Sequence, residues 1–166
     1  SVSSGDFNND GFRDILIGAY NSLGGVGKTY VIFGHNGTWQ TSINSSNIGT
    51  TISGVQFIGS SGSQCGTSVS NAGDVNKDGN DDIIIGGYNA SPQGRIYAGV
   101  AWIVFGRSAT SWTSKPTTMN LGAPTLSDGV ITIQGSATGD WLGQSISGRV
   151  DVNDDGIHDV IIGAPQ

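Results

Sequence analysis

The most informative absence in this sequence of 166 residues is that of glutamate. All 13 acidic residues are aspartate, whereas a merely solvated acidic surface would use both residue types. Short carboxylates suit tight turns and metal ligation. Basic residues are also few, seven in total, and the formal net charge is −6. The chain therefore lacks the basic face that binding to nucleic acid requires.

Other absences exclude further classes of protein. The single cysteine, Cys65, cannot form a disulfide within the chain, and we expect it to be a small buried residue. No apolar run reaches the ~18 residues that a membrane helix needs, so no membrane span is expected. Charged residues make up only 12% of the chain and leucine is scarce, whereas glycine occurs 28 times. This composition disfavours helices and favours short strands joined by tight turns.

The strongest pattern that is present is a threefold repeat. The copies span residues 4–18, 72–86 and 149–163, and each contains the pattern D-x-N-x-D-G-x-x-D. The first Asp of each copy lies at position 6, 74 or 151, so the spacing is 68 and then 77 residues. In the third copy Val150 replaces the glycine that precedes this Asp. Self-similarity of this kind indicates repeating supersecondary units.

Each repeat is expected to supply short strands in the same order. A small-residue strand precedes the Asp loop, a buried apolar strand follows it, and two more strands complete the unit. The expected strands are 2–4, 15–17, 29–34 and 55–58, then 67–70, 83–85, 100–106 and 130–133, then 144–147 and 160–162. Four antiparallel strands every ~70 residues predict an all-β fold of β-propeller blades, about two and a half of them in this chain.

The expected blades cover residues 1–60 and 61–136, and residues 137–166 form the first half of a third blade. A half blade would leave an apolar strand edge uncovered, and such edges invite pairing with another chain. We therefore expect further blades, from the same parent chain or from other chains, to complete the propeller. On this interpretation the chain is not a free monomer.

The Asp-rich loop has the donor spacing of a cage around a cation. Side chains at positions 1, 3, 5 and 9 and the carbonyl of position 7 would supply oxygen ligands, and the glycine at position 6 permits the sharp turn. Oxygen-only donors favour Ca²⁺ over Zn²⁺ or copper, and their number favours Ca²⁺ over Mg²⁺. The expected ligands are Asp6, Asn8, Asp10, the Phe12 carbonyl and Asp14; Asp74, Asn76, Asp78, the Asn80 carbonyl and Asp82; and Asp151, Asn153, Asp155, the Ile157 carbonyl and Asp159.

Charge and recurrence support this hypothesis. Nine of the 13 Asp residues stand at ligand positions, and three carboxylates crowded into one loop repel one another without a cation. Three Ca²⁺ ions per chain would neutralise the formal charge of −6. The alternative is an Asx-rich turn without metal, against which the threefold recurrence of every ligand type argues. An EF-hand or dockerin loop is excluded because its acidic position 12 is Ile17, Ile85 or Ile162 here.

These residues resemble FG-GAP repeats, the blades of the integrin α-subunit propeller and of many bacterial surface and secreted proteins. The GAP element would be residues 18–20, 86–88 and 163–165, and the FG element would be residues 65–66 and 142–143. The Asp loop matches the calcium loop of the family residue by residue. The resemblance implies a propeller, usually of seven blades, with bound Ca²⁺. It also implies a platform for adhesion or ligand binding, or a non-catalytic companion to an enzyme.

The favoured interpretation is a calcium-stabilised module, extracellular or at the cell surface, for adhesion, ligand binding or surface structure. Its ligand would be a protein or a carbohydrate. The alternative is the propeller of a secreted enzyme, catalytic or not, that acts on polysaccharide or lipid. A third hypothesis is a repeat unit of a surface filament whose chains complete each other's blades. No Ser-His-Asp order, pair of free carboxylates or phosphate loop is found, so no catalytic residue is assigned and no enzyme is expected.

Several other residues carry two interpretations. His35 and His158 are expected to be solvated loop residues, with His158 at loop position 8 pointing out of its cage. Trp39 and Trp112 occupy similar places after the third strands and are expected to pack, and the alternative is an exposed pair for sugar stacking. The remaining expectations are Trp102 in the core, Trp141 at a blade interface, and glycosylation sequons at Asn36, Asn44 and Asn89 that matter only in a eukaryotic secretory pathway.

Overall fold

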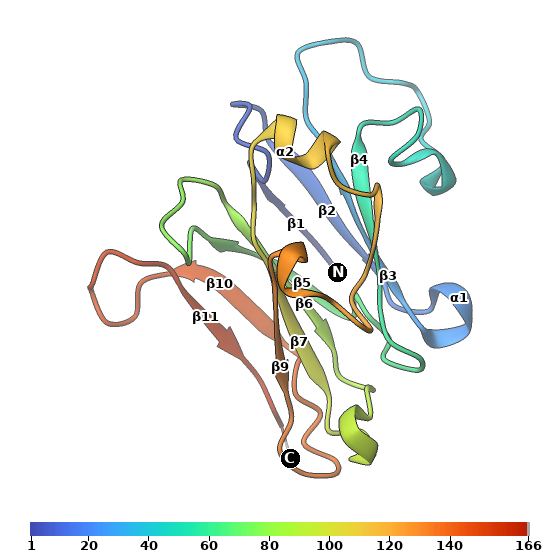
Figure 1. Cartoon of the computed structure of the whole chain (residues 1–166), viewed down its shortest axis with the longest axis vertical. Coiled ribbons are helices and arrows are strands. Elements are labelled where there is room, and N and C mark those ends of the chain that lie inside the picture. Colours follow the sequence, from blue (N-terminus) through green and yellow to red (C-terminus); the bar gives the residue numbers. More distant parts are fainter. Residues whose placement is uncertain (166) are drawn as a thin grey trace.

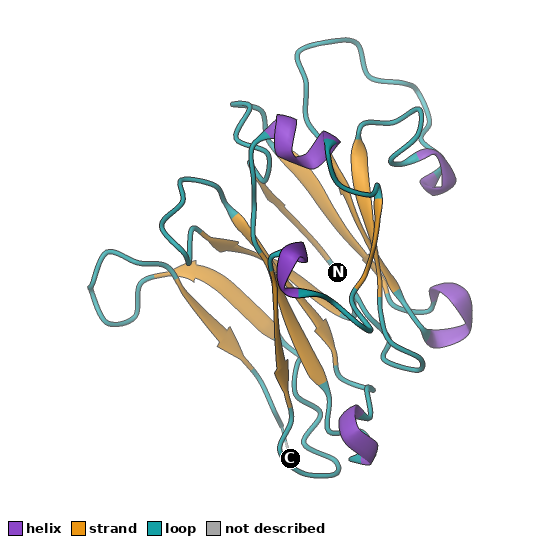
Figure 2. Cartoon of the chain, in the orientation of Figure 1, coloured by secondary structure: helices purple, strands orange, loops and turns teal. Residues whose placement is uncertain are grey.

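The computed structural model describes residues 1–165, in which eleven strands form sheets that stand side by side (Figures 1 and 2). Blade 1 contains β1 (Val2–Gly5), β2 (Asp14–Ala19), β3 (Lys28–Ile32) and β4 (Gly54–Ile58), paired antiparallel in that order. Blade 2 contains β5 (Ser68–Gly73), β6 (Asp82–Gly87), β7 (Val100–Val104) and β9 (Val130–Gln134), also antiparallel. The hairpin of β10 (Ile146–Val150) and β11 (Asp159–Ile162) follows. The predicted all-β fold of propeller blades is confirmed.

One strand was not predicted. β8 (Thr118–Asn120) comes from the connection between β7 and β9, yet it pairs in parallel with β4 and becomes a fifth strand of blade 1. Only Met119 of its three residues is buried. The expectation of four strands per blade is therefore wrong for blade 1, because so short a strand carries no period and its partner lies far away in sequence.

Helical turns occupy the connections and leave the sheets uninterrupted (Figure 2). They are α1 (Ser22–Gly25), η1 (Ser45–Asn47), η2 (Pro92–Gly94), α2 (Ala109–Thr113) and η3 (Leu126–Asp128). Within residues 1–165 no helix has both the length and the apolar composition needed to cross a membrane.

The apolar strands pack by strict alternation of their side chains. Ile83 and Ile85 of β6 join the core between blades 1 and 2, whereas Ile84 joins the core shared with β10 and β11. Successive side chains of a strand point to opposite faces, so a strand that is apolar throughout can bury both faces. All six residues of β6 and all five of β7 are buried, and Trp102 of β7 is only 1% exposed, as predicted. Blade 2 is thus the centre of the structure.

The serine-rich first strands join neighbouring blades. The hydroxyl oxygens of Ser1 and Ser3 accept hydrogen bonds from the backbone N–H groups of Val69 and Asn71, over 3.1 and 3.0 Å. A small hydroxyl allows two backbones to approach closely and still satisfies the donors that the sheet leaves unpaired. The small polar residues of these strands therefore form the seam between blades 1 and 2.

The connection from β7 to β9 also crosses from blade 2 to blade 1. It carries α2, whose Trp112 is 5% exposed and packs on Phe33 and Phe57 with ring centroids 5.8 and 6.4 Å away. The Trp112 Nε1–H donates to the Phe7 carbonyl over 2.8 Å. Trp39 does not match it: this side chain stacks on His35 and stays 41% exposed. The prediction that both tryptophans pack is correct for Trp112 and wrong for Trp39.

Candidate metal centres

The three Asp-rich loops lie along one edge of the stack, each at the same end of its blade (Figure 1). They connect β1 to β2, β5 to β6 and β10 to β11, as the repeat predicted. Residues at loop positions 4 and 6 adopt left-handed backbone conformations in all three loops. These residues are Asn9, Lys77 and Asp154 at position 4, with φ of 53, 60 and 59°, and Gly11, Gly79 and Gly156 at position 6, with φ of 87, 88 and 77°. Two such residues in three positions turn the chain sharply back on itself.

The carboxylate at position 1 holds each turn together. Asp6 accepts hydrogen bonds from the N–H groups of Asp10 and Gly11, at 3.1 and 3.0 Å. The same pair of bonds recurs at Asp74, with Asp78 and Gly79 at 3.0 and 2.8 Å, and at Asp151, with Asp155 and Gly156 at 3.1 and 2.8 Å. A charged acceptor strengthens such bonds, so the first Asp is fixed by the backbone that it wraps.

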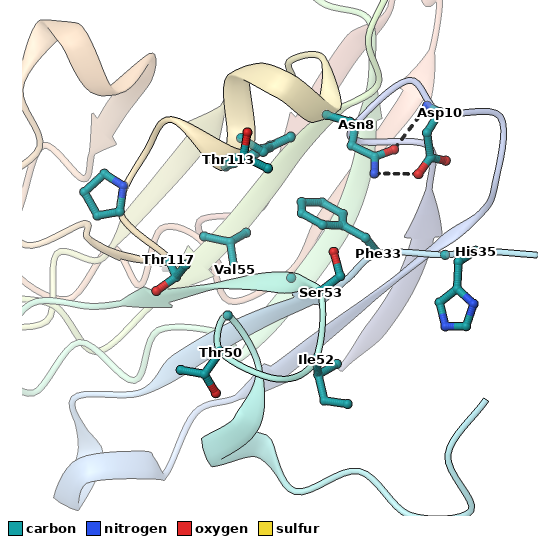
Figure 3. A pocket seen from close by; sticks show the side chains of 16 residues that line it. Asn8, Asp10, Phe33, His35, Thr50, Ile52, Ser53, Val55, Thr113 and Thr117 are labelled. Carbon is teal, nitrogen blue, oxygen red and sulfur yellow. Dashed lines mark hydrogen bonds between the residues drawn. The ribbon is translucent and has the colours of Figure 1, made fainter. Parts of the chain in front are cut away.

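Oxygens of positions 1 and 3 converge in every loop. The N–H of Asp10 lies 3.1 Å from Asp6 Oδ1 and 3.2 Å from Asn8 Oδ1, so one donor is shared by two side-chain oxygens. The Asn8 Nδ2–H donates to Asp10 Oδ2 over 2.8 Å (Figure 3). Equivalent contacts occur in the other loops, where Asp78 meets Asp74 and Asn76, and Asp155 meets Asp151 and Asn153. Positions 1, 3 and 5 are thus brought together in each loop.

Position 9 is placed differently from a simple closing ligand. Asp14 is fully buried, and its two oxygens accept from the N–H groups of Phe7 and Gly34, over 2.7 and 2.8 Å. Asp82 repeats this with Val75 and Gly106, over 2.9 and 2.7 Å. Asp159 accepts from Val152 over 2.9 Å. The first two carboxylates therefore tie the start of the loop to a glycine two residues after the third strand, a structural role that the sequence motif did not reveal.

Burial controls the electrostatics of these two carboxylates. Desolvation raises the pKa of Asp14 to about 6, against the hydrogen bonds from Gly34 and Phe7 that lower it, and the nearby charges of Asp10 and Asp6 raise it further. The pKa of Asp82 is raised to about 6 by the same desolvation. A cation among these carboxylates would favour their ionised forms.

The donor chemistry of the loops fits a hard cation, although the side chains contact one another directly. Within residues 1–165, no group of three or more His, Cys, Asp or Glu side chains is arranged to hold a metal ion. The oxygens instead satisfy backbone N–H groups and the Asn amides. Each carboxylate oxygen has two lone pairs, so one accepted hydrogen bond leaves capacity for a metal bond. The set of carboxylate and amide oxygens is the kind that Ca²⁺ prefers.

Loop 1 is more enclosed than the other two. Asn8 is only 3% exposed and Phe7 is fully buried, whereas Asn76 and Asn153 are exposed. The α2 segment covers loop 1, and an open cavity of about 460 Å³ is lined by both and by the residues that precede and begin β4 (Figure 3). Its lining includes Phe33, Val55 and Trp112, with Asn8 and Asp10 at the rim on the loop side.

Other residues singled out in the sequence have varied surroundings. Cys65 is fully buried, as predicted, and burial raises the pKa of its thiol to about 12. The backbone N–H of Trp141 donates to the Tyr97 carbonyl of blade 2 over 3.1 Å. Of the three sequons, Asn36 and Asn44 are exposed, whereas the Asn89 side chain donates to the Gly62 carbonyl over 2.9 Å.

Comparison with known proteins agrees with this geometry. The family model described as FG-GAP repeat matches residues 1–32 and 66–103, which contain the first two Asp loops. Integrin alpha-6 of Homo sapiens is 29% identical over 164 residues, 96% of this chain, and integrin alpha-6 of Gallus gallus is 26% identical over 165 residues. Integrin alpha-IIb of Homo sapiens is 29% identical over 172 residues, 99% of this chain. The chain spans only 12–14% of the length of these relatives. Residues 1–32 and 66–103 thus match the FG-GAP repeat family, and the whole chain, with its repeated Asp loops and stacked antiparallel propeller blades, is similar to integrin α chains.

Proposed function

We propose that this chain is an extracellular, calcium-stabilised β-propeller module that serves adhesion or ligand binding. The observation that carries the proposal is the recurrence of one loop geometry three times along one edge of the stack. In each loop, side-chain oxygens of positions 1 and 3 accept from the backbone N–H of position 5. The side chain of position 5 in turn accepts from the Asn amide of position 3. In every copy the carboxylates of positions 1 and 5 stand in the same turn, where they repel each other unless a cation is bound.

Each loop position has a distinct task in this proposal. Positions 1, 3 and 5 would bind the ion together with the carbonyl of position 7, and the glycine at position 6 allows the turn. Position 9 would complete the cage while it anchors the loop to the third strand, as Asp14 and Asp82 do through Gly34 and Gly106. When bound, Ca²⁺ would offset the mutual repulsion of the carboxylates and so lock the first two strands of each blade together.

The similarity to integrin α chains supports a binding role over an enzymatic one. We infer that the stacked sheets position loops for recognition of a protein or carbohydrate, and that further blades complete the propeller. External calcium at millimolar concentration would fill sites even of modest affinity. Catalysis is not part of the proposal.

The test is the calcium stoichiometry of the chain. Protein dialysed against buffer with a defined free Ca²⁺ concentration should retain close to three Ca²⁺ per chain by metal analysis. Asp78→Ala removes a position-5 ligand and should lower the value to close to two. Asp128→Ala removes a carboxylate outside the loops and should leave the value at three. Folded wild-type protein that retains no calcium at millimolar concentration would contradict the proposal.

A further inference from the structure

The three loops differ at position 8, which is Arg13, Asp81 or His158. This position lies outside the ligand set, yet in two loops it reaches the neighbouring blade. Asp81 Oδ2 accepts a hydrogen bond from the backbone N–H of Asp6 over 3.2 Å, and His158 Nδ1 accepts one from the N–H of Asp74 over 3.1 Å. In both cases the donor is the position-1 residue of the preceding loop.

Two unlike side chains therefore perform the same contact. A carboxylate and an imidazole share only the ability to accept a hydrogen bond in this place. Since the receiving residue is the same in both pairs, the contact is a repeated property of the blade stacking. It fixes the peptide group of the residue whose carboxylate holds the whole loop turn, at Asp6 in blade 1 and at Asp74 in blade 2.

Asp81, the acceptor between blades 1 and 2, is itself held in place. Asp81 Oδ2 also accepts from Asn71 Nδ2 over 2.8 Å and lies 3.6 Å from Arg149 Nη1. The same Asn71 Nδ2 lies 3.2 Å from the carbonyl oxygen of Ser4 in blade 1. The Asp81 side chain is 17% exposed. Residues of β10, blade 2 and blade 1 thus meet around one carboxylate oxygen.

His158, the acceptor between blade 2 and the β10–β11 hairpin, is held in place by a glycine. Gly73 directly precedes Asp74 and has a φ of 72°. A Cβ on Gly73 would lie 2.4 Å from Cγ of His158, so the imidazole rests against the backbone. This close approach keeps the His158 ring over the N–H that it accepts from, and any side chain at residue 73 would displace it.

We propose that the position-8 side chain is a positioning residue for the metal loop of the preceding blade, so that the calcium affinity of each loop depends on the next blade. The inference rests on the proposed calcium function. Asp81 positions the first ligand of loop 1, and His158 positions that of loop 2. A loop whose position-1 peptide is already fixed loses less conformational freedom when it binds the ion.

The experiment measures calcium affinity loop by loop in the full chain. The backbone amide signals of Gly11, Gly79 and Gly156 in ¹⁵N–¹H spectra report the three loops separately during a Ca²⁺ titration. Asp81→Ala should weaken binding at the Gly11 loop roughly fivefold, the effect of losing about one hydrogen bond. The Gly79 loop, which contains residue 81, should change less. Asp81→Asn keeps an acceptor and should restore the Gly11 loop to within about twofold of wild type.

The contact of His158 with Asp74 gives an independent test, for which two variants of His158 form a matched pair. His158→Phe keeps a ring but removes the acceptor, and it should weaken the Gly79 loop by a similar factor. His158→Asn keeps an acceptor near the Nδ1 position and should restore it. Asp140→Ala removes a carboxylate outside the loops and is the control for the negative charge that Asp81→Ala removes.

The outcomes separate this inference from the proposed function. Wild-type chain that binds no calcium in any loop would contradict the proposed function. Wild-type chain that binds calcium, with unchanged affinity at the preceding loop in both acceptor-free variants, would overturn the coupling alone. Weakening confined to the variant's own loop would overturn it as well. If Asp81→Ala fails to fold, His158→Phe decides the question, because it changes the outer hairpin and not the central blade.

Discussion

At the scale of single residues, Trp112 shows how one side chain joins two blades to an Asp-rich loop. Its ring lies between Phe33 and Phe57 of blade 1, and its indole N–H donates to the carbonyl of Phe7, the second residue of loop 1. The guanidinium of Arg107 lies 4.5 Å from the ring centroid. A buried aromatic residue with a satisfied polar atom contributes both apolar burial and orientation.

Trp112 and Trp39, which occupy similar sequence positions, should therefore contribute differently to the free energy of unfolding. Trp112→Ala should lower the free energy of unfolding by about 3–5 kcal/mol, because a large buried ring is removed. Trp39→Ala should cost less than about 1 kcal/mol, since this ring is partly exposed. Urea denaturation followed by circular dichroism measures both values. Equal losses in the two variants would show that Trp39 is as well packed as Trp112.

At the scale of elements, glycines explain why blades can stand so close together. The glycine at the start of the first two GAP elements faces the glycine of the next FG element. A Cβ on Gly18 would lie 2.0 Å from the Gly66 carbonyl oxygen, and one on Gly86 would lie 2.1 Å from that of Gly143. Each FG glycine also donates its N–H to the GAP glycine of its own blade, Gly66 to Gly86 and Gly143 to Gly163, over 3.0 Å. The two sequence elements therefore form the seam at the end opposite the Asp loops.

This seam should not tolerate even one methyl group. Gly86→Ala places a Cβ against backbone, which cannot rotate away, and should lower the free energy of unfolding by roughly 1–3 kcal/mol or more. Gly37→Ala is the matched control, because its nearest neighbour is the His35 side chain at 3.2 Å in an exposed loop. Thermal unfolding of both variants measures the difference. A Gly86→Ala variant as stable as Gly37→Ala would mean that the blades separate more easily than the close approach implies.

The periodic elements could be predicted from the sequence because they follow local rules. Apolar triplets such as 83–85 bounded by glycine indicate short strands, and all ten predicted strands exist. β8 and α2 could not be predicted in this way, since their stability depends on blade 1, which lies far away in sequence. Their composition, rich in Ser and Thr, is that of an ordinary loop.

The candidate sites were predictable in part for a similar reason. The spacing of positions 1, 3 and 5 is a local property, and the structure brings these side chains together in each loop. The anchoring of Asp14 to Gly34 and the contact of Asp81 with Asp6 connect residues of different strands or blades. No spacing rule reports such contacts. The assignment of all five positions as calcium ligands stays a prediction.

At the scale of the whole molecule, the blades form a stack. Each blade contacts its neighbours both at the Asp loops and at the GAP and FG glycines of the opposite end. Blade 2 is covered on both faces, by blade 1 and by the β10–β11 hairpin, whereas the hairpin has exposed apolar residues such as Ile161, at 53%. In such repeating structures, stability is nearly a sum of unit and nearest-neighbour terms. Protection from local opening should therefore be greatest in the middle of the stack.

Hydrogen exchange read by mass spectrometry can test this distribution together with the role of calcium. In calcium, peptides from β6 and β7 should exchange slowest, because every residue of these strands is buried. On the proposed function, Ca²⁺ binds only the folded loops, so chelation should favour their opening by mass action. Exchange should then rise most in the peptides that cover residues 6–14, 74–82 and 151–159. It should rise least in β4, which lies across the sheet from loop 1. A uniform increase in all peptides would place the effect of calcium in global stability, and no increase anywhere would mean that the loops hold their shape through the Asp and Asn hydrogen bonds alone.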